Sequence, residues 1–156
     1  MLRWLILVIT HAAMLAIGFV AGVYTLPILT APKGPDTATL QATARAATFK
    51  GRFERNLKGS DFLHWGEGDV SVSRDRIGHE GRLAPGPDYK LYLTNRFVDT
   101  KQGFLDIKPQ ARLIGDVKTF NGFLLSVPPD VDVSQYNTVI VWCESFSAFI
   151  TAAKFR

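Results

Sequence analysis

The apolar residues of this chain form one long run, followed by a region of short alternations. No Asp, Glu, Lys or Arg lies between Arg3 and Lys33, and residues 5–26 are almost entirely apolar. At about 1.5 Å per residue that run spans about 33 Å, enough to cross a hydrocarbon core of about 30 Å. Trp4 and Tyr24 stand near its two ends, where amphipathic rings favour the headgroup level, and Pro27 is expected to end the helix. The pattern predicts a transmembrane helix within residues 1–29.

A cleaved signal peptide is the alternative for an apolar N-terminal segment. Its apolar region is normally about 7 to 15 residues long and ends at an Ala-x-Ala-like site. Here the run is longer, and the candidate exit near Ala31 is followed by Pro32. We therefore expect an uncleaved anchor held by membrane lipid. The positive charge of Arg3 favours a cytoplasmic N-terminus, which places residues 33–156 in the periplasm or outside the cell.

Two features inside the predicted helix suggest further roles. Gly18 and Gly22 form a GxxxG step, which lets two helices approach closely and suggests a helix-mediated homodimer. Chance is the competing explanation, because glycine is common in membrane helices. His11 is ionisable, but it lies only two turns from the N-terminal end, so we expect a neutral, partly hydrated side chain.

Residues 30–48 are rich in Ala, Thr and Pro and poor in large apolar residues. Such a segment buries little surface, so it predicts a linker with at most a frayed helix over residues 39–47. The composition then shifts to Phe, Val, Leu, Gly and Asp. Residues 49–156 are enough for one domain.

Within residues 49–156 the apolar positions recur mostly every second residue. Alternation over 49–53, 65–73 and 89–94 is typical of strands with one buried face. Asn121-Gly122 predicts a type I′ turn that joins strands at about 113–120 and 123–127 in a tight hairpin. No convincing helical stripe follows residue 48. The pattern predicts an all-β domain, an antiparallel β-sandwich or flattened barrel.

The segment Thr138–Cys143 is nearly continuous β-branched and apolar sequence, which predicts a central strand buried on both faces. Cys143 shares the parity of Val139 and Val141, whereas Ile140 and Trp142 occupy the other face. A lone cysteine in such a strand is usually an inert, buried apolar residue. The alternative is a redox thiol or an axial ligand to haem iron.

Composition removes several other classes of function. One cysteine allows no intrachain disulfide and no zinc site built from two or four cysteines. A net charge of +4, with 18 basic residues scattered among 14 acidic ones, provides little basis for nucleic-acid binding. His64 and His79 are placed near turns and within reach of solvent, but their spacing is a weak metal signal, so we predict no metal site.

Several landmarks together resemble the DM-thirteen domain family over residues 49–156. They are His64-x-Gly66-x-Gly68-x-Val70, Gly86-Pro87-Asp88 before Leu91-Tyr92-Leu93, Leu113-x-Gly115-x-x-Lys118, Gly122, Val127-Pro128, Tyr136, and Val139-Ile140-Val141-Trp142-Cys143 followed by Phe146 and Phe149. The resemblance implies a β-sandwich-like domain outside the cytoplasm that takes part in electron transfer. In the role proposed for that family, the cysteine matched by Cys143 is a free thiol or a ligand to a prosthetic group such as haem.

The leading hypothesis is therefore a membrane-anchored redox module that exchanges electrons with a protein partner through Cys143. If haem is the cofactor, we expect His64, Trp142 and Phe146 to help bind it, with Phe149 in the same apolar slot. The rival hypothesis is a non-catalytic binding or structural module in which Cys143 only packs. A hydrolase or metalloenzyme is a distant third.

Overall fold

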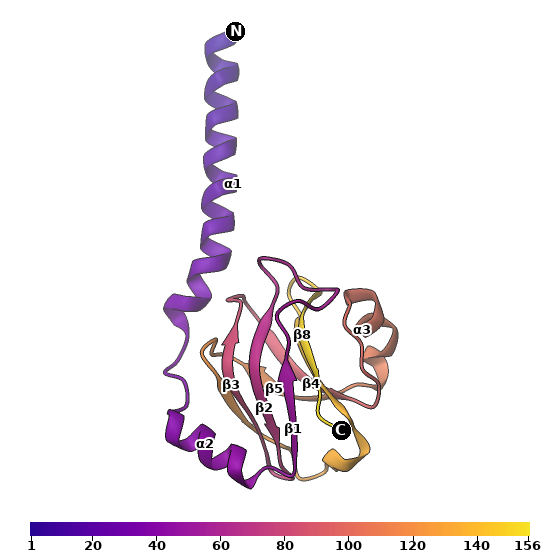
Figure 1. The fold of residues 1–156 in the computed structure, drawn as a ribbon. Helices are drawn as coiled ribbons and strands as arrows, with labels where there is room; N and C mark the ends of the chain where they lie inside the picture. Colours follow the sequence, from indigo (N-terminus) through magenta and orange to yellow (C-terminus); the bar gives the residue numbers. More distant parts are fainter.

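Eight strands form two antiparallel sheets that pack face to face in a computed structural model describing residues 1–156 (Figure 1). The first sheet has the order β1-β2-β3-β6, and its strands are β1 Phe49–Phe53, β2 Gly66–Val72, β3 Arg76–Leu83 and β6 Phe123–Ser126. The second sheet has the order β5-β4-β7-β8, and its strands are β5 Arg112–Val117, β4 Tyr89–Thr94, β7 Thr138–Cys143 and β8 Ala148–Lys154. The predicted β-sandwich is confirmed.

Three helices and two short 3-10 turns complete the chain. Their bounds are α1 Leu2–Thr30, α2 Thr37–Ala46, α3 Lys101–Ile107, and the turns Lys108–Gln110 and Val133–Gln135. Helix α1 runs away from the sheets, with the N-terminus at its far end (Figure 1). It is long and apolar enough to cross a membrane. The expectation that Pro27 ends this helix is wrong: Pro27 lies inside α1, which ends at Thr30, two residues before Pro32.

The main core lies between the two sheets. Twenty buried apolar residues from both sheets and their connections form it, including Phe53, Ile77, Leu91, Val141 and Cys143. Helix α2 covers part of the outer face of the first sheet, where Leu40 and Thr43 are buried. The predicted linker thus contains a formed helix, whose N-terminus is capped by the Asp36 side chain.

A second, smaller core lies on the outer face of the second sheet, beneath α3. It contains Trp142, which is fully buried and lies 4.9 Å, ring centroid to centroid, from Phe104 of α3. β7 is consequently buried on both faces, as its sequence predicts. The sequence pattern did not indicate α3. This helix has no convincing stripe because it is short and buries only Phe104 and Ile107.

The predicted hairpin at Asn121-Gly122 is also wrong. β5 pairs with β4 in the second sheet, whereas β6 pairs with β3 in the first, so the connection crosses between sheets. Only Gly122 of the pair has a positive φ, 102°, and a type I′ turn needs two. The Leu83 N–H donates to the Phe120 carbonyl at 2.8 Å, which ties the connection to β3. Tertiary pairing has overridden the local turn signal.

Candidate functional site

Cys143 is the last residue of β7 and faces the interior of the sandwich. Its side chain shares this face with Val139 and Val141, as the parity predicts. The residue is 2% exposed, and the Sγ–H donates to the Pro87 carbonyl oxygen at 3.0 Å. The thiol is therefore held at one end of the sandwich, between β7 and the loop before β4.

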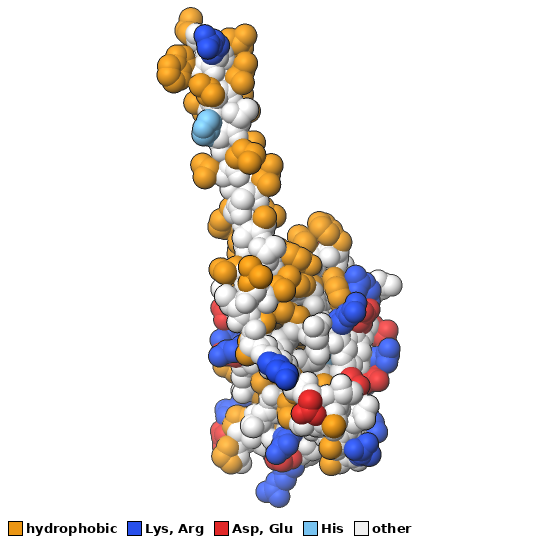
Figure 2. Space-filling model, turned by 90° about the vertical axis from the view of Figure 1, so that its left-hand side faces the viewer, with side chains coloured by type: hydrophobic (Ala, Val, Ile, Leu, Met, Phe, Trp, Pro, Cys, Tyr) orange, Lys and Arg blue, Asp and Glu red, His pale blue; other side chains and the backbone are white.

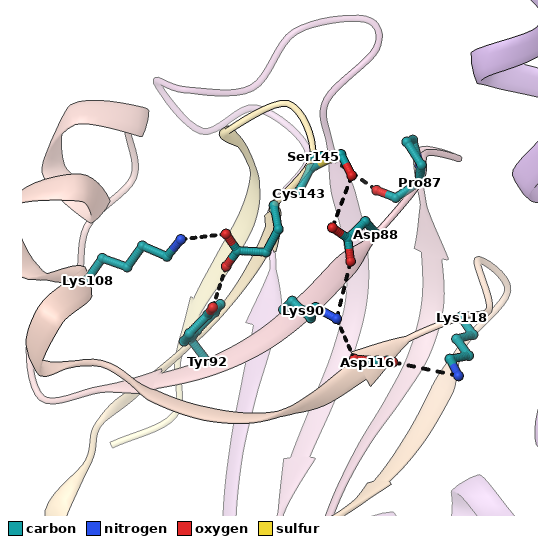
Figure 3. A network of polar contacts seen from close by, with 10 residues as sticks. Pro87, Asp88, Lys90, Tyr92, Lys108, Asp116, Lys118, Cys143 and Ser145 are labelled. Atoms are coloured by element: carbon teal, nitrogen blue, oxygen red, sulfur yellow. Dashed lines mark hydrogen bonds and ion pairs between the residues drawn. The ribbon is translucent and has the colours of Figure 1, made fainter.

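Two turns with left-handed backbone hold that end in place. Asp88 (φ 53°) precedes β4 and Ser147 (φ 46°) precedes β8, and neither is glycine. Such conformations persist when neighbouring contacts determine them. The Asp88 carbonyl accepts the Glu144 N–H at 3.1 Å. The Asp88 carboxylate accepts the Ser145 hydroxyl at 3.0 Å (Figure 3). These bonds hold the turn after Cys143 against the loop whose Pro87 carbonyl accepts the hydrogen bond from the thiol.

A polar network surrounds the outer side of the same turn (Figure 3). The Glu144 carboxylate accepts a hydrogen bond from the Tyr92 hydroxyl and pairs with the Lys108 ammonium at 2.6 Å. Partial burial opposes ionisation of Glu144, but the bonds from Lys108 and Tyr92 prevail and lower its pKa. Lys90 bridges Asp88 and Asp116 at 3.2 and 2.7 Å. Two acidic side chains, Asp88 and Glu144, are thus held in place near the sulfur.

These surroundings keep Cys143 protonated at neutral pH. Burial raises the pKa of the thiol, and the negative charges of Asp88 and Glu144 add to that rise. The backbone N–H groups of Ser145 and Phe146 oppose it without reversing it. A thiolate forms only if a base removes the proton or the charges nearby change.

Cys143 borders an apolar cavity of about 350 Å³ between the end of the sandwich and the C-terminal half of α1. The sandwich contributes Cys143, His64 and Phe146, and α1 contributes Phe19 and Tyr24. A volume of this size is in the range of small-ligand sites. Figure 2 shows hydrophobic side chains gathered where α1 meets the domain. Three of the five residues that the sequence nominated for this site, Cys143, His64 and Phe146, therefore meet at one cavity.

His64 enters the cavity wall from the long connection between β1 and β2. Its Nδ1 lies 2.9 Å from a carboxylate oxygen of Asp61, and the Asp61 side chain also accepts the backbone N–H of His64 at 2.8 Å. The pKa of Asp61 is lowered: burial opposes the shift, and the bonds from His64 and Leu63 outweigh it. A carboxylate on Nδ1 orients the ring and leaves Nε2 free. Sequence reasoning missed Asp61, although its i, i+3 spacing from His64 was visible.

One protein-family model matches the domain that contains this site. The model described as "Electron transfer DM13" matches residues 48–155, which cover the whole sandwich and Cys143. The chain belongs to the electron transfer DM13 family. No curated protein and no solved structure matches the chain.

The DM13 domain places the remaining candidate residues elsewhere. Trp142 points away from Cys143, into the second core with Phe104 and Phe149, so neither Trp142 nor Phe149 lines the cavity. His79 is not near a turn: it is fully buried in β3, between the rings of Phe53 and Phe123 at 5.1 Å each. Its Nε2 lies 3.0 Å from the Glu67 carbonyl oxygen, and burial lowers its pKa to about 4. No group of three or more His, Cys, Asp or Glu side chains is arranged to hold a metal ion.

The residues around Cys143 do not fit a haem held by this sulfur. A cysteine ligates haem iron as a thiolate, yet the Cys143 S–H donates to Pro87 and the thiol pKa is raised. No lysine or arginine lines the cavity to meet the haem carboxylates. Trp142, one of the expected haem contacts, is on the opposite face of β7. The donor set supports a thiol near a potential base, Cys143 and His64, better than an axial ligand.

Proposed function

We propose that this DM13 protein is a membrane-anchored electron-transfer module in which Cys143 acts as a redox thiol. α1 holds it in the membrane, with the N-terminus in the cytoplasm and the sandwich in the periplasm or outside the cell. The carrying observation is that the chain's single thiol and His64, whose ring is held by Asp61, border one cavity. Family membership supports electron transfer, and the apolar cavity is where a reactant can meet the sulfur.

The reaction that one thiol can perform here is disulfide exchange with a redox protein partner. His64, oriented by Asp61, is the base in the cavity wall for removing the Cys143 proton. The resulting thiolate attacks one sulfur of a partner disulfide, so a new S–S bond forms and the partner's S–S bond breaks. The departing partner sulfur takes the electron pair and a proton. Cys143 is oxidised to the disulfide level, and one partner sulfur is reduced to a thiol.

The test is the rate at which the native full chain, in detergent micelles, reacts with a small neutral aromatic disulfide. The thiol should react without unfolding, more slowly than free cysteine because its pKa is raised, and faster as pH increases. His64→Gln should slow the reaction by at least about tenfold, a conservative share of what a general base contributes. Lys118→Gln, which alters an exposed side chain paired only with Asp116 at 3.6 Å, is the matched surface control.

A second candidate is a non-catalytic membrane-bound module in which Cys143 only packs. Its 2% exposure and its hydrogen bond to Pro87 favour this role. In that case the thiol would react only after denaturation, and His64→Gln would leave its rate unchanged. The same experiment therefore separates the two candidates.

A further inference from the structure

The exposed apolar side chains of the β domain are unevenly placed. Six large ones are exposed, namely Phe62, Leu63, Phe97, Leu105, Leu113 and Phe146. Half of them come from two loops: Phe62 and Leu63 from the β1–β2 connection, and Phe146 from the β7–β8 turn. We call these three residues the apolar tip. Phe62 is 83% exposed and Phe146 50%, which leaves a large apolar area without a partner in the domain.

Both loops lie at the same end of the sandwich (Figure 1). β1 ends and β2 begins there, and β7 ends and β8 begins there as well. Leu63 and Phe146 border the same cavity as Phe19 and Tyr24, so the apolar tip lies beside the C-terminal half of α1. In Figure 2 the hydrophobic side chains of the helix continue onto this end of the domain. The tip and the helix therefore share one apolar surface.

The position along α1 gives the depth of the tip. The apolar run ends at Leu26, and Phe19 lies seven residues earlier, about 10 Å along a helix axis. If residues 5–26 span the hydrocarbon, a loop that reaches the level of residues 19–25 lies at the boundary between acyl chains and headgroups. Peripheral apolar elements bury about 5–10 Å at that boundary. The tip then has lipid as its natural partner.

We propose that the apolar tip inserts into the lipid bilayer beside α1 and docks this end of the sandwich on the membrane surface. A bilayer fits better than a second protein because the surface is continuous with a helix already apolar enough to span the membrane. The charges of the β1–β2 connection are balanced: Glu54 and Asp61 against Arg55 and Lys58. The attraction is consequently apolar and insensitive to salt.

Docking would place the Cys143 cavity at the headgroup level, so a small apolar reactant would reach it from the lipid phase. This inference rests on α1 spanning the bilayer and does not depend on the redox role of Cys143. If the thiol proved unreactive, the docking proposal would be unaffected. If the tip did not dock, the proposed thiol chemistry would be unaffected.

The experiment uses the full chain, in a Cys143→Ala background, reconstituted into phosphatidylcholine nanodiscs. A nitroxide is attached at Phe62→Cys or Phe146→Cys, with Leu113→Cys, similarly exposed at 45%, as the matched control and Asp75→Cys as the aqueous reference. Labels on the tip should be relaxed by dissolved oxygen and lose relaxation by a water-soluble nickel complex, at low and high salt alike. Labels at positions 75 and 113 should keep the nickel effect.

Tip labels that respond to nickel as position 75 does would overturn the proposal, and so would tip labels shielded from both reagents, which would indicate a protein partner. A label at Ile9→Cys reports whether α1 is embedded; an aqueous signal there would overturn the spanning premise and the docking with it. A second measurement needs no substitution: photoactivatable phosphatidylcholine should crosslink the unaltered chain at residues 62–63 and 146. Adducts confined to α1 would contradict docking.

Discussion

The two faces of strand β7 lie in different surroundings. On the outer face, Trp142 is sealed beneath α3 against Phe104. On the inner face, one residue later, Cys143 lies where the main core ends and a cavity of about 350 Å³ begins. Both side chains are almost fully buried, at 0% and 2% exposure. Burial alone therefore does not distinguish a packing residue from a candidate reactive one, whereas the presence of a cavity does.

The largest loss of stability should come from removing the buried indole on the outer face of β7. Trp142→Ala removes a fully buried indole from its contact with Phe104, so we expect a loss of about 3–5 kcal/mol in the free energy of unfolding. Denaturant titration of the full chain in micelles measures it, with Trp142→Phe as the milder control. A loss below about 1 kcal/mol would contradict the sealed core.

The inner layer should instead be sensitive to acid through His79. This ring is neutral in the fold, with its pKa lowered from 6.5 to about 4, mainly by burial. Between those values the unfolded chain binds a proton that the folded chain does not. The free energy of unfolding should therefore fall as pH falls from about 6.5 to about 4, by up to about 3 kcal/mol. His79→Phe should remove this part of the pH dependence, and an unchanged slope in that variant would count against it.

The network beside Cys143 should have a smaller effect on stability. Glu144→Gln breaks the pair with Lys108, and we expect a loss of about 1–2 kcal/mol at neutral pH. The pKa of Glu144 is lowered, so this contribution is present above its unfolded value near 4.5 and is lost as pH falls towards the folded value. Removing the charge should also lower the thiol pKa and speed its reaction.

Asp116→Asn is the matched control for that variant. It breaks the pair with Lys90, but the Asp116 side chain is 48% exposed, so we expect a loss of at most about 1 kcal/mol. Denaturant titrations at pH 7 and pH 4 compare the two variants. Equal losses at both pH values in Glu144→Gln would argue against an ionised pair there.

The smallest effect on stability should follow from Cys143 itself. Cys143→Ala deletes one sulfur at the cavity edge, which should cost about 1 kcal/mol. The same change removes all disulfide exchange, because the chain has no other cysteine. Thermal unfolding and exchange rates, measured on the same preparation, test both statements. A loss of stability near that of Trp142→Ala would indicate that Cys143, like Trp142, is a packing residue.

The continuous apolar run over residues 138–143 predicted the central position of β7, and the parity of its residues predicted the opposite directions of Cys143 and Trp142. The sequence pattern failed where local signals competed with tertiary pairing. The Asn121-Gly122 pair looked like a hairpin, but the flanking strands bury their faces in different sheets. β3 and β8 gave weak signals because one contains two glycines and a buried histidine, and the other is rich in alanine.

The candidate site was predictable only in part, for a physical reason. Cys143, His64 and Phe146 were found from residue type and resemblance, but the cavity that joins them is closed by α1, more than 100 residues away from Cys143 along the chain. Asp61 carried a readable local signal. No such local signal marked Pro87, Glu144 or Lys108, since their roles depend on strand pairing and on how the turns lie against each other.

The most direct test of the central claim is the redox state of Cys143 in intact membranes that contain the full chain. Thiols are quenched with acid, the protein is denatured, and a mass-shifting maleimide counts free Cys143 before and after chemical reduction. The account predicts that part of the population is blocked as a reversible disulfide, and that reduction restores labelling. Complete labelling before reduction, unchanged after exposure to an oxidant, would contradict it and leave Cys143 as a packing residue.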